Sequence, residues 1–149
     1  MDLVIRKLTE NDFAQWKALW IGYLDFYVSE VTDEVTQTTF KRLLAEDEPM
    51  HCLVAEHQGA LVGLVHFICH RSTWTTGDYC YLQDLFVSAS GRKQGTGRAL
   101  IAAVSTAAAA LNCSKVYWMT RENNYRARAL YDQVATKTDF IQYRAAQSS

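Results

Sequence analysis

The stretch YLQDLFVSASGRKQGTGRALI, residues 81–101, passes from an apolar run through a loop of small and basic residues into a helical pattern. The apolar run predicts a strand over residues 79–87, with Gln83 and Asp84 as polar residues at its centre. The loop that follows carries basic residues but no carboxylate. Such a loop suits a phosphate, because the first N–H groups of a helix are unpaired and its N-terminus is partly positive.

Within this loop, Gly95 and Gly97 would allow a ligand to approach the backbone closely. The cations that could meet a pyrophosphate are Arg92, Lys93 and Arg98. A tight turn beside a solvated helix face is the alternative interpretation. A P-loop is excluded, because the string GxxxxGK[ST] is absent. The dinucleotide pattern GxGxxG is incomplete, since Leu100 replaces its third glycine, although Glu122 lies where a ribose-binding acid is expected.

The length of 149 residues and a 49% hydrophobic content predict one folded domain over residues 1–149. A net charge of −1 gives no global attraction to nucleic acid or to an anionic membrane, and we expect neither as a partner. The N-terminus lacks a secretory pattern and no apolar run is long enough to span a membrane, so we expect a cytoplasmic protein. Four widely spaced cysteines without a CxxC pair predict reduced core thiols and no metal site.

Hydrophobic periodicity predicts an α/β fold with a mixed, mostly antiparallel central sheet flanked by helices. The expected strands cover residues 3–8, a hairpin at 51–70, and residues 79–87, 114–120 and 139–144. The expected helices cover residues 13–27, a segment carrying Phe40, Leu43 and Leu44, a segment ending near Asn112, and residues 123–135.

Two motifs carry a resemblance to a known family. The segment of residues 81–101 and the later NNYRARALYDQVA resemble the GCN5-related N-acetyltransferase (GNAT) family. Its acetyl-CoA signature, [RQ]xxGx[GA] after a strand, is matched by Arg92, Gly95 and Gly97, and its second motif, NxxAxxxY, by Asn124, Ala127 and Tyr131. The resemblance covers essentially the whole chain and is nearest to the polyamine (spermidine/spermine) and histone/polyamine acetyltransferases.

The resemblance implies an acetyl-CoA-dependent N-acetyltransferase, a homodimer, and an acetyl-CoA cleft beside the strand at residues 79–87. The strand backbone would pair with the pantetheine arm of the cofactor, as an added strand does. The implied cofactor-binding residues are Leu85, Phe86, Val87, Arg92, Lys93, Gln94, Gly95, Thr96, Gly97, Arg98, Asn124, Ala127 and Tyr131.

Acetyl transfer to an amine needs a neutral amine, a stabilised oxyanion and a proton for the departing thiolate. The resemblance makes Tyr131 the candidate acid, and a core tyrosine is the alternative. Asp84 is either held structurally by hydrogen bonds or serves as a base. Gln83 is a departure, because similar polyamine acetyltransferases often carry a glutamate there and glutamine cannot accept a proton. A second departure is Ala135, followed by threonine, where the family has a Gly-Phe pair.

The acceptor is expected to be a small cationic amine such as a polyamine, because acidic and aromatic side chains gather in residues 23–34. The candidate substrate-binding residues are Tyr23, Asp25, Tyr27, Glu30 and Gln83. A solvated helix end would give the same pattern. A protein or peptide amine, an amino acid and an aminoglycoside remain alternative acceptors, and a module that binds acetyl-CoA without turnover is the alternative from another class.

Overall fold

The computed structural model describes residues 2–92 and 94–147, so Lys93 lies outside the described residues. The chain forms two compact units, Met1–Met119 and Thr120–Ser149. The first unit holds a sheet with helices on both faces, and the second is built around one helix. Each unit is described separately below.

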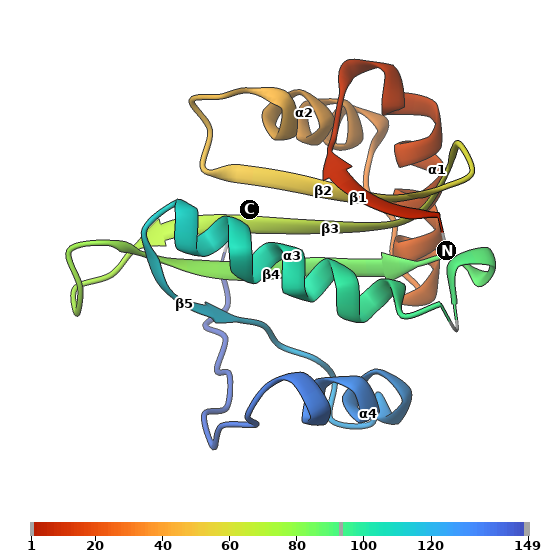
Figure 1. Cartoon of the computed structure of the whole chain (residues 1–149). Helices are drawn as coiled ribbons and strands as arrows, with labels where there is room; N and C mark the ends of the chain where they lie inside the picture. The colour runs from red at the N-terminus through yellow and green to blue at the C-terminus, as the bar shows by residue number, and fades with distance from the viewer. Residues whose placement is uncertain (1, 93, 148–149) are drawn as a thin grey trace. The chain divides into compact units, whose positions relative to one another are not determined.

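The first unit contains a five-stranded sheet in the order β1-β2-β3-β4-β5 (Figure 1). Its strands are β1 (Leu3–Lys7), β2 (Met50–His57), β3 (Ala60–Arg71), β4 (Asp78–Val87) and β5 (Cys113–Tyr117). All neighbours are antiparallel except β4 and β5, which are parallel. The predicted hairpin is confirmed, and its turn places Gln58 and Gly59 at positive φ, as a two-residue turn between twisted strands requires. The predicted mixed, mostly antiparallel sheet is therefore confirmed.

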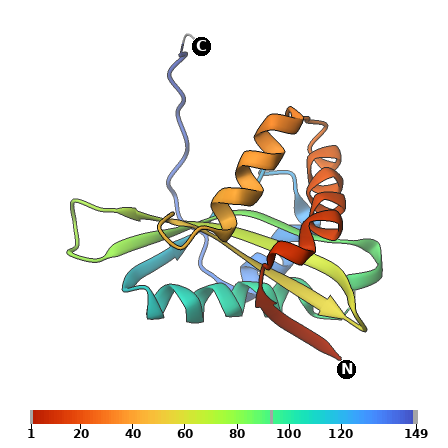
Figure 2. The same cartoon turned by 90° about the horizontal axis from the view of Figure 1, so that it is seen from above.

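Helices cover both faces of this sheet (Figure 2). A short 3₁₀ turn, η1 (Glu10–Asp12), leads into α1 (Phe13–Phe26), and α2 (Asp33–Leu44) follows it on the same face. The opposite face carries α3 (Thr96–Ala110). The large apolar side chains of α1 and α2 recur at helical spacing and are buried together with side chains of β2 and β3. Burying each such side chain contributes about 1.5–3 kcal/mol, which fixes both helices on the sheet.

The N-terminus of α1 is fixed by an ionic network between β1 and η1. The Arg6 guanidinium donates to both carboxylate oxygens of Asp12, at 2.8 and 2.9 Å, and its Nε donates to Glu56 Oε1 at 2.7 Å. Asp12 also accepts from the backbone N–H of Thr9 at 2.8 Å, in the arrangement of a capping box. The pKa of Asp12 is lowered to about 2, chiefly by its hydrogen bonds from Arg6.

All four cysteines lie on strands and are free thiols, as predicted. Burial raises the pKa of Cys69 to about 12 and that of Cys80 to about 11. Cys69 and Cys113 bring their sulfur atoms to 3.5 Å. The raised pKa values leave the thiols of Cys69 and Cys80 protonated and unreactive at neutral pH.

The second unit contains α4 (Tyr125–Val134), which confirms the predicted short helix. The predicted strand over residues 139–144 is wrong, because this segment has no strand pairing. Its apolar residues are instead exposed, with Phe140 at 88%, Ile141 at 76% and Tyr143 at 88%. Within its own unit the segment has no strand to pair with among the described residues, and an unpaired strand is not stable in water.

Candidate functional site

One edge of β4 is paired over only part of its length. The register with β5 runs from Asp78 opposite Cys113 to Tyr81 opposite Tyr117, where β5 ends (Figure 1). Residues 82 and 84–87 of β4 remain paired with β3 on the other side. In the sheet of the first unit, the predicted cofactor-binding segment from Leu85 to Val87 therefore offers backbone groups to a ligand along the side from which β5 has departed.

A β-bulge interrupts β4 just beyond this point. Phe67 is paired with Leu82 and its neighbour His66 with Asp84, so Gln83 is the extra residue between two consecutive pairs. Gln83 is exposed, whereas Asp84 is largely buried. Strict alternation along β4 would place Gln83 and Asp84 on opposite faces, and the bulge breaks that alternation.

The predicted phosphate loop is held by side-chain hydrogen bonds to its own backbone. Thr96 is buried and its hydroxyl donates to the carbonyl of Gly91 at 2.8 Å, while Gln94 donates to the carbonyl of Ser90 at 2.8 Å. Gly95 precedes α3 with φ of +73°, a left-handed conformation that favours glycine. These hydrogen bonds therefore fix the conformation of the loop that leads into the N-terminus of α3.

Around that helix end, Arg92 and Arg98 are exposed cations, and Gly97 lies in the first turn of α3. The structure thus brings together the loop residues that the signature motif predicted, apart from Lys93, which is not described. An exposed helix N-terminus with two arginines is suited to a phosphate group.

On the α1 side of the sheet, Asp84 is part of a hydrogen-bonded chain. His66 Nδ1 lies 2.9 Å from Asp84 Oδ2, and the indole N–H of Trp16 donates to His66 Nε2 at 3.0 Å. Tyr23 on α1 lies close enough to Asp84 for the carboxylate charge to raise the pKa of its hydroxyl. The Asp84 side chain keeps 13% of its surface exposed, so it is held in place and still reachable from solvent.

Aromatic rings of α1 surround this chain. Trp20 stacks between Trp16, with ring centroids 6.0 Å apart, and Tyr23, at 5.7 Å, because these positions follow one face of the helix. Tyr27 packs edge-on against Tyr23 at 5.0 Å. Burial, followed by the charge of Asp84, raises the pKa of Tyr23 well above its ordinary value. Tyr23 therefore stays protonated throughout the neutral range and remains a hydrogen-bond donor.

The other predicted acceptor residues lie differently. Asp25 at the end of α1 and Glu30 in the following loop are exposed. Of the predicted acceptor set, Tyr23 contacts Asp84 and Tyr27 contacts Tyr23, whereas the two acids have a solvated position. The buried indole N–H of Trp20 has no hydrogen-bond partner among the described residues.

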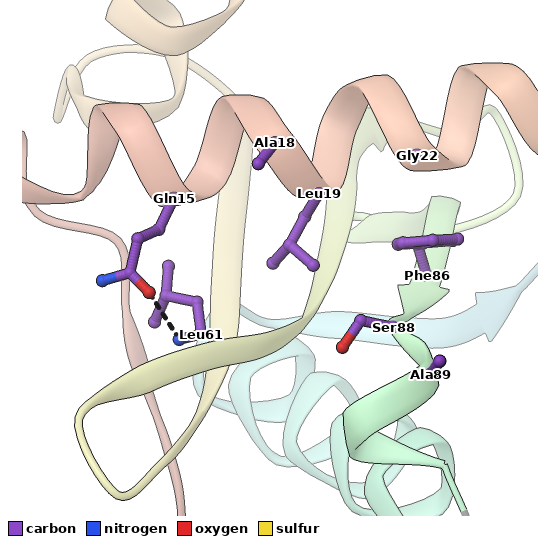
Figure 3. A pocket seen from close by; sticks show the side chains of 8 residues that line it. All are labelled: Gln15, Ala18, Leu19, Gly22, Leu61, Phe86, Ser88 and Ala89. Atoms are coloured by element: carbon purple, nitrogen blue, oxygen red, sulfur yellow. Dashed lines mark hydrogen bonds between the residues drawn. The ribbon is translucent and has the colours of Figure 1, made fainter.

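An open cavity of about 380 Å³ lies between α1 and the end of β4 (Figure 3). Gln15 on its wall accepts a hydrogen bond from the backbone N–H of Leu61 at 2.9 Å. Phe86 is the one predicted cofactor-binding residue that lines the cavity, and its ring lies 3.0 Å from the position of a side chain on Gly22. Phe86 therefore serves chiefly to pack β4 against α1.

In the second unit, the residues of the asparagine-to-tyrosine motif share one face of α4. Asn124 stands at its N-terminus and its side-chain amide donates to the Thr120 hydroxyl at 3.2 Å. Ala127 and Tyr131 follow at helical spacing and are half-buried. The helix ends at Val134, and Ala135, where the family has glycine, is extended with φ of −150°.

Sequence reasoning missed the partners of Asp84. Neither His66 nor Trp16 is among the residues predicted for the site. The available signal was that His66 and Asp84 are polar residues inside apolar strands that form a hairpin. Counting along an even register would place Gln83 opposite His66, so the bulge concealed the true pair.

Among residues 2–92 and 94–147, no group of three or more histidine, cysteine, aspartate or glutamate side chains is arranged to hold a metal ion. None of the helices in the described part of the chain has the length and apolar content needed to cross a membrane.

Residues 16–135 match the model of the acetyltransferase (GNAT) family, and the chain belongs to that family. It is accordingly an acyltransferase. Over 144 residues it is 33% identical to a D-amino-acid N-acetyltransferase of Saccharomyces cerevisiae, covering 95% of this chain and 89% of that protein. Over 96 residues it is 38% identical to the thialysine N-epsilon-acetyltransferase of Mus musculus, covering 58% of this chain and 55% of that protein.

The fold is also found among solved acetyltransferases. An aminoglycoside N-acetyltransferase in complex with CoA matches with a TM-score of 0.83 and 17% identity, covering 98% of this chain and 95% of that chain. The predicted fold class is therefore confirmed.

Proposed function

We propose that this protein transfers the acetyl group of acetyl-CoA to the primary amine of a small cationic molecule, with Asp84 as the base and Tyr131 as the acid. The observation that carries the proposal is the position of Asp84, a partly exposed carboxylate in β4 beside the unpaired edge of that strand. The acceptor class draws support from the relatives named for D-amino acids and thialysine, which are small amines.

The described residues fit acetyl-CoA at two places. The edge of β4 beyond Tyr81 has backbone groups available to the amides of a pantetheine arm. The N-terminus of α3, with Gly95 and the side chains of Arg92 and Arg98, suits the pyrophosphate. When bound, acetyl-CoA would supply the activated acetyl thioester, and the loop and strand would orient it.

An alkylammonium with an ordinary pKa near ~10.4 is almost fully protonated at neutral pH and cannot attack a thioester. Asp84 would accept one proton from the ammonium, directly or through a water molecule. A carboxylate has about four lone-pair sites, and His66 uses one of them, which leaves room for the acceptor. The rings of Tyr23 and Tyr27 would favour a cation at the same place. Gln83 would act as an exposed hydrogen-bonding group instead of a base.

The chemical step would form a bond between the amine nitrogen and the carbonyl carbon and break the bond between carbon and sulfur. The departing thiolate would take its proton from the Tyr131 phenol, which recovers one from solvent. The attacking nitrogen loses its second proton to solvent, so the products are an acetamide, free CoA and one net proton. The assignment of Tyr131 rests on the motif that it completes with Asn124 and Ala127.

The test is release of CoA thiol with a panel of acceptors: spermidine, thialysine, D- and L-amino acids, an aminoglycoside and a lysine peptide. We expect turnover with one of the small amines. On the best acceptor, Asp84→Asn should lower kcat by about 10²–10⁴-fold, the range for loss of a positioned base, and leave acetyl-CoA binding nearly unchanged. Asp47→Asn, at an exposed carboxylate in the loop after α2, is the matched control. Turnover of the peptide alone, or full activity of Asp84→Asn, would contradict the proposal.

We also propose that the protein is a cytoplasmic homodimer. Four free cysteines agree with a reducing compartment. The exposed apolar side chains of Phe140, Ile141 and Tyr143 are a surface that a second copy would cover. Size-exclusion chromatography with light scattering should give twice the chain mass, and replacing the three residues by serine should give monomers. A wild-type protein that is monomeric at all concentrations would refute the dimer.

A further inference from the structure

We infer that His66, held in one tautomer by Trp16, is the residue that positions Asp84 for catalysis. The inference rests on the proposed role of Asp84 as a base and adds two residues to it. Both residues are buried beneath the site, with Trp16 at 0% and His66 at 4% exposure, so neither would touch the acceptor. They would act only through the carboxylate.

The hydrogen bonds define the state of the imidazole. An indole N–H can only donate, so the 3.0 Å contact from Trp16 makes His66 Nε2 an acceptor without a proton. The proton of the neutral ring is then on Nδ1, which lies 2.9 Å from Asp84 Oδ2 and donates to it. In a doubly protonated ring, the N–H at His66 Nε2 would face the indole N–H of Trp16, and neither could accept a hydrogen bond. The indole therefore selects the tautomer that presents a donor to the carboxylate.

Of the groups around Asp84, His66 is the one that fixes the orientation of the carboxylate. Asp84 faces Tyr23 from α1 and His66 from β3, and the charge of Asp84 also reaches the Cys52 thiol on β2. Tyr23 and Cys52 both have a raised pKa, so both are uncharged at neutral pH. Tyr81 on β4 acts on Tyr23 and is likewise a phenol. Among the printed contacts of Asp84, the hydrogen bond thus comes from the imidazole of His66, a rigid ring buried in the core.

A catalytic base beside a β-bulge needs a neighbouring group that holds its carboxylate in place. A β-bulge loosens the ladder around Asp84, because the extra residue is left out of the pairing. An imidazole that is hydrogen-bonded and packed against two indoles compensates, since the centroid of its ring lies 5.9 Å from that of Trp16 and 5.4 Å from that of Trp20. Without it the carboxylate could rotate away from the acceptor, and a misplacement of about 1 Å can lower a rate by about 10²-fold.

Two substitutions of His66 separate the two hydrogen bonds. In His66→Asn the side-chain amide reaches the place of Nδ1, so it keeps a donor to Asp84 and loses the acceptor for Trp16. In His66→Gln the amide reaches the place of Nε2, so it keeps the acceptor for Trp16 and loses the donor. We expect His66→Gln to lower kcat by about 10-fold to 10²-fold with a small change in the acceptor KM, and His66→Asn to retain most of kcat.

The pH profile of kcat/KM gives a second readout. In His66→Gln its acidic limb should differ from that of the wild type, because the carboxylate has lost the hydrogen bond from the imidazole. In His66→Asn the limb should stay near that of the wild type. His51→Gln on β2, whose ring stacks on Phe67, is the matched control and should change neither quantity. Equal kcat values and equal profiles for the two His66 variants would overturn the inference.

The tautomer can be measured without an assay of activity. In protein labelled with ¹⁵N-histidine, NMR should find His66 protonated on Nδ1 alone near neutral pH, and Trp16→Phe should weaken that preference. Protonation of Nε2 in the wild type would overturn the inference. If no amine in the panel is acetylated, the proposed function fails, and this measurement still decides whether the Trp16–His66–Asp84 chain exists as described.

Discussion

The ionic network at the start of α1 makes the stability of this protein sensitive to acid. Asp12 is almost buried, with 7% of its side chain exposed, and its pKa falls from an ordinary 3.8 to about 2 in the folded state. Since the folded value is the lower one, the network stabilises the fold above pH ~4 and this contribution is lost as the pH falls through about 2. A shift of that size corresponds to about 2 kcal/mol at neutral pH.

Urea unfolding followed by circular dichroism at several pH values between 7 and 2.5 measures this contribution. Asp12→Asn should be less stable than the wild type at pH 7, and the gap should narrow by about 2 kcal/mol towards the lowest pH. The control is Asp33→Asn, whose ion pair with Lys17 is 3.6 Å long and exposed, so its gap should stay within about 1 kcal/mol. A gap for Asp12→Asn that does not change with pH would refute the reasoning.

Four further substitutions, at three positions, test the predicted acetyl-CoA site. Tyr131→Phe should lower kcat by about 10²–10⁴-fold in steady-state assays with little change in acetyl-CoA affinity, and wild-type turnover would remove Tyr131 as the acid. Gly97→Glu should abolish acetyl-CoA binding by calorimetry at a nearly unchanged melting temperature, because it adds a negative charge at the N-terminus of α3; an unchanged Kd would exclude Gly97 from the site. Gly95→Ala should cost about 1–2 kcal/mol in urea unfolding from backbone strain alone, since nothing lies within 4 Å of the added carbon. Gly95→Asn should cost less, and equal losses for the two would argue against strain.

Most of the first unit could be predicted from the sequence because its signals are local. The aromatic spacing of α1, the Gln58–Gly59 turn and the glycine before α3 each determine a conformation through residues close in the chain. The segment of residues 139–144 carries the strand-forming residues Phe140, Ile141 and Tyr143 and is not a strand. Such residues indicate that a segment could form a strand. A strand also needs an unpaired sheet edge to bind to, and the local sequence does not specify one.

The candidate site was predictable only in part for the same reason. The loop before α3 follows a contiguous motif, and its residues lie around the helix end as expected. The surroundings of Asp84 depend on Trp16, Tyr23 and His66, which come from two other elements. The residues next to Asp84 in the sequence indicate neither the contact from α1 nor the shift in register at the bulge.

The bulge at Gln83 and the departure of β5 after Tyr81 occur almost side by side on β4. A bulge bends the strand that carries it, so a straight neighbour cannot follow beyond it. The opening in the sheet therefore depends on the one extra residue that β4 has between two consecutive pairs with β3. It does not depend on any particular side chain. A chain with residue 83 deleted would keep Asp84 opposite His66 while straightening β4. The deletion would therefore remove the open edge of the sheet and leave the carboxylate in place.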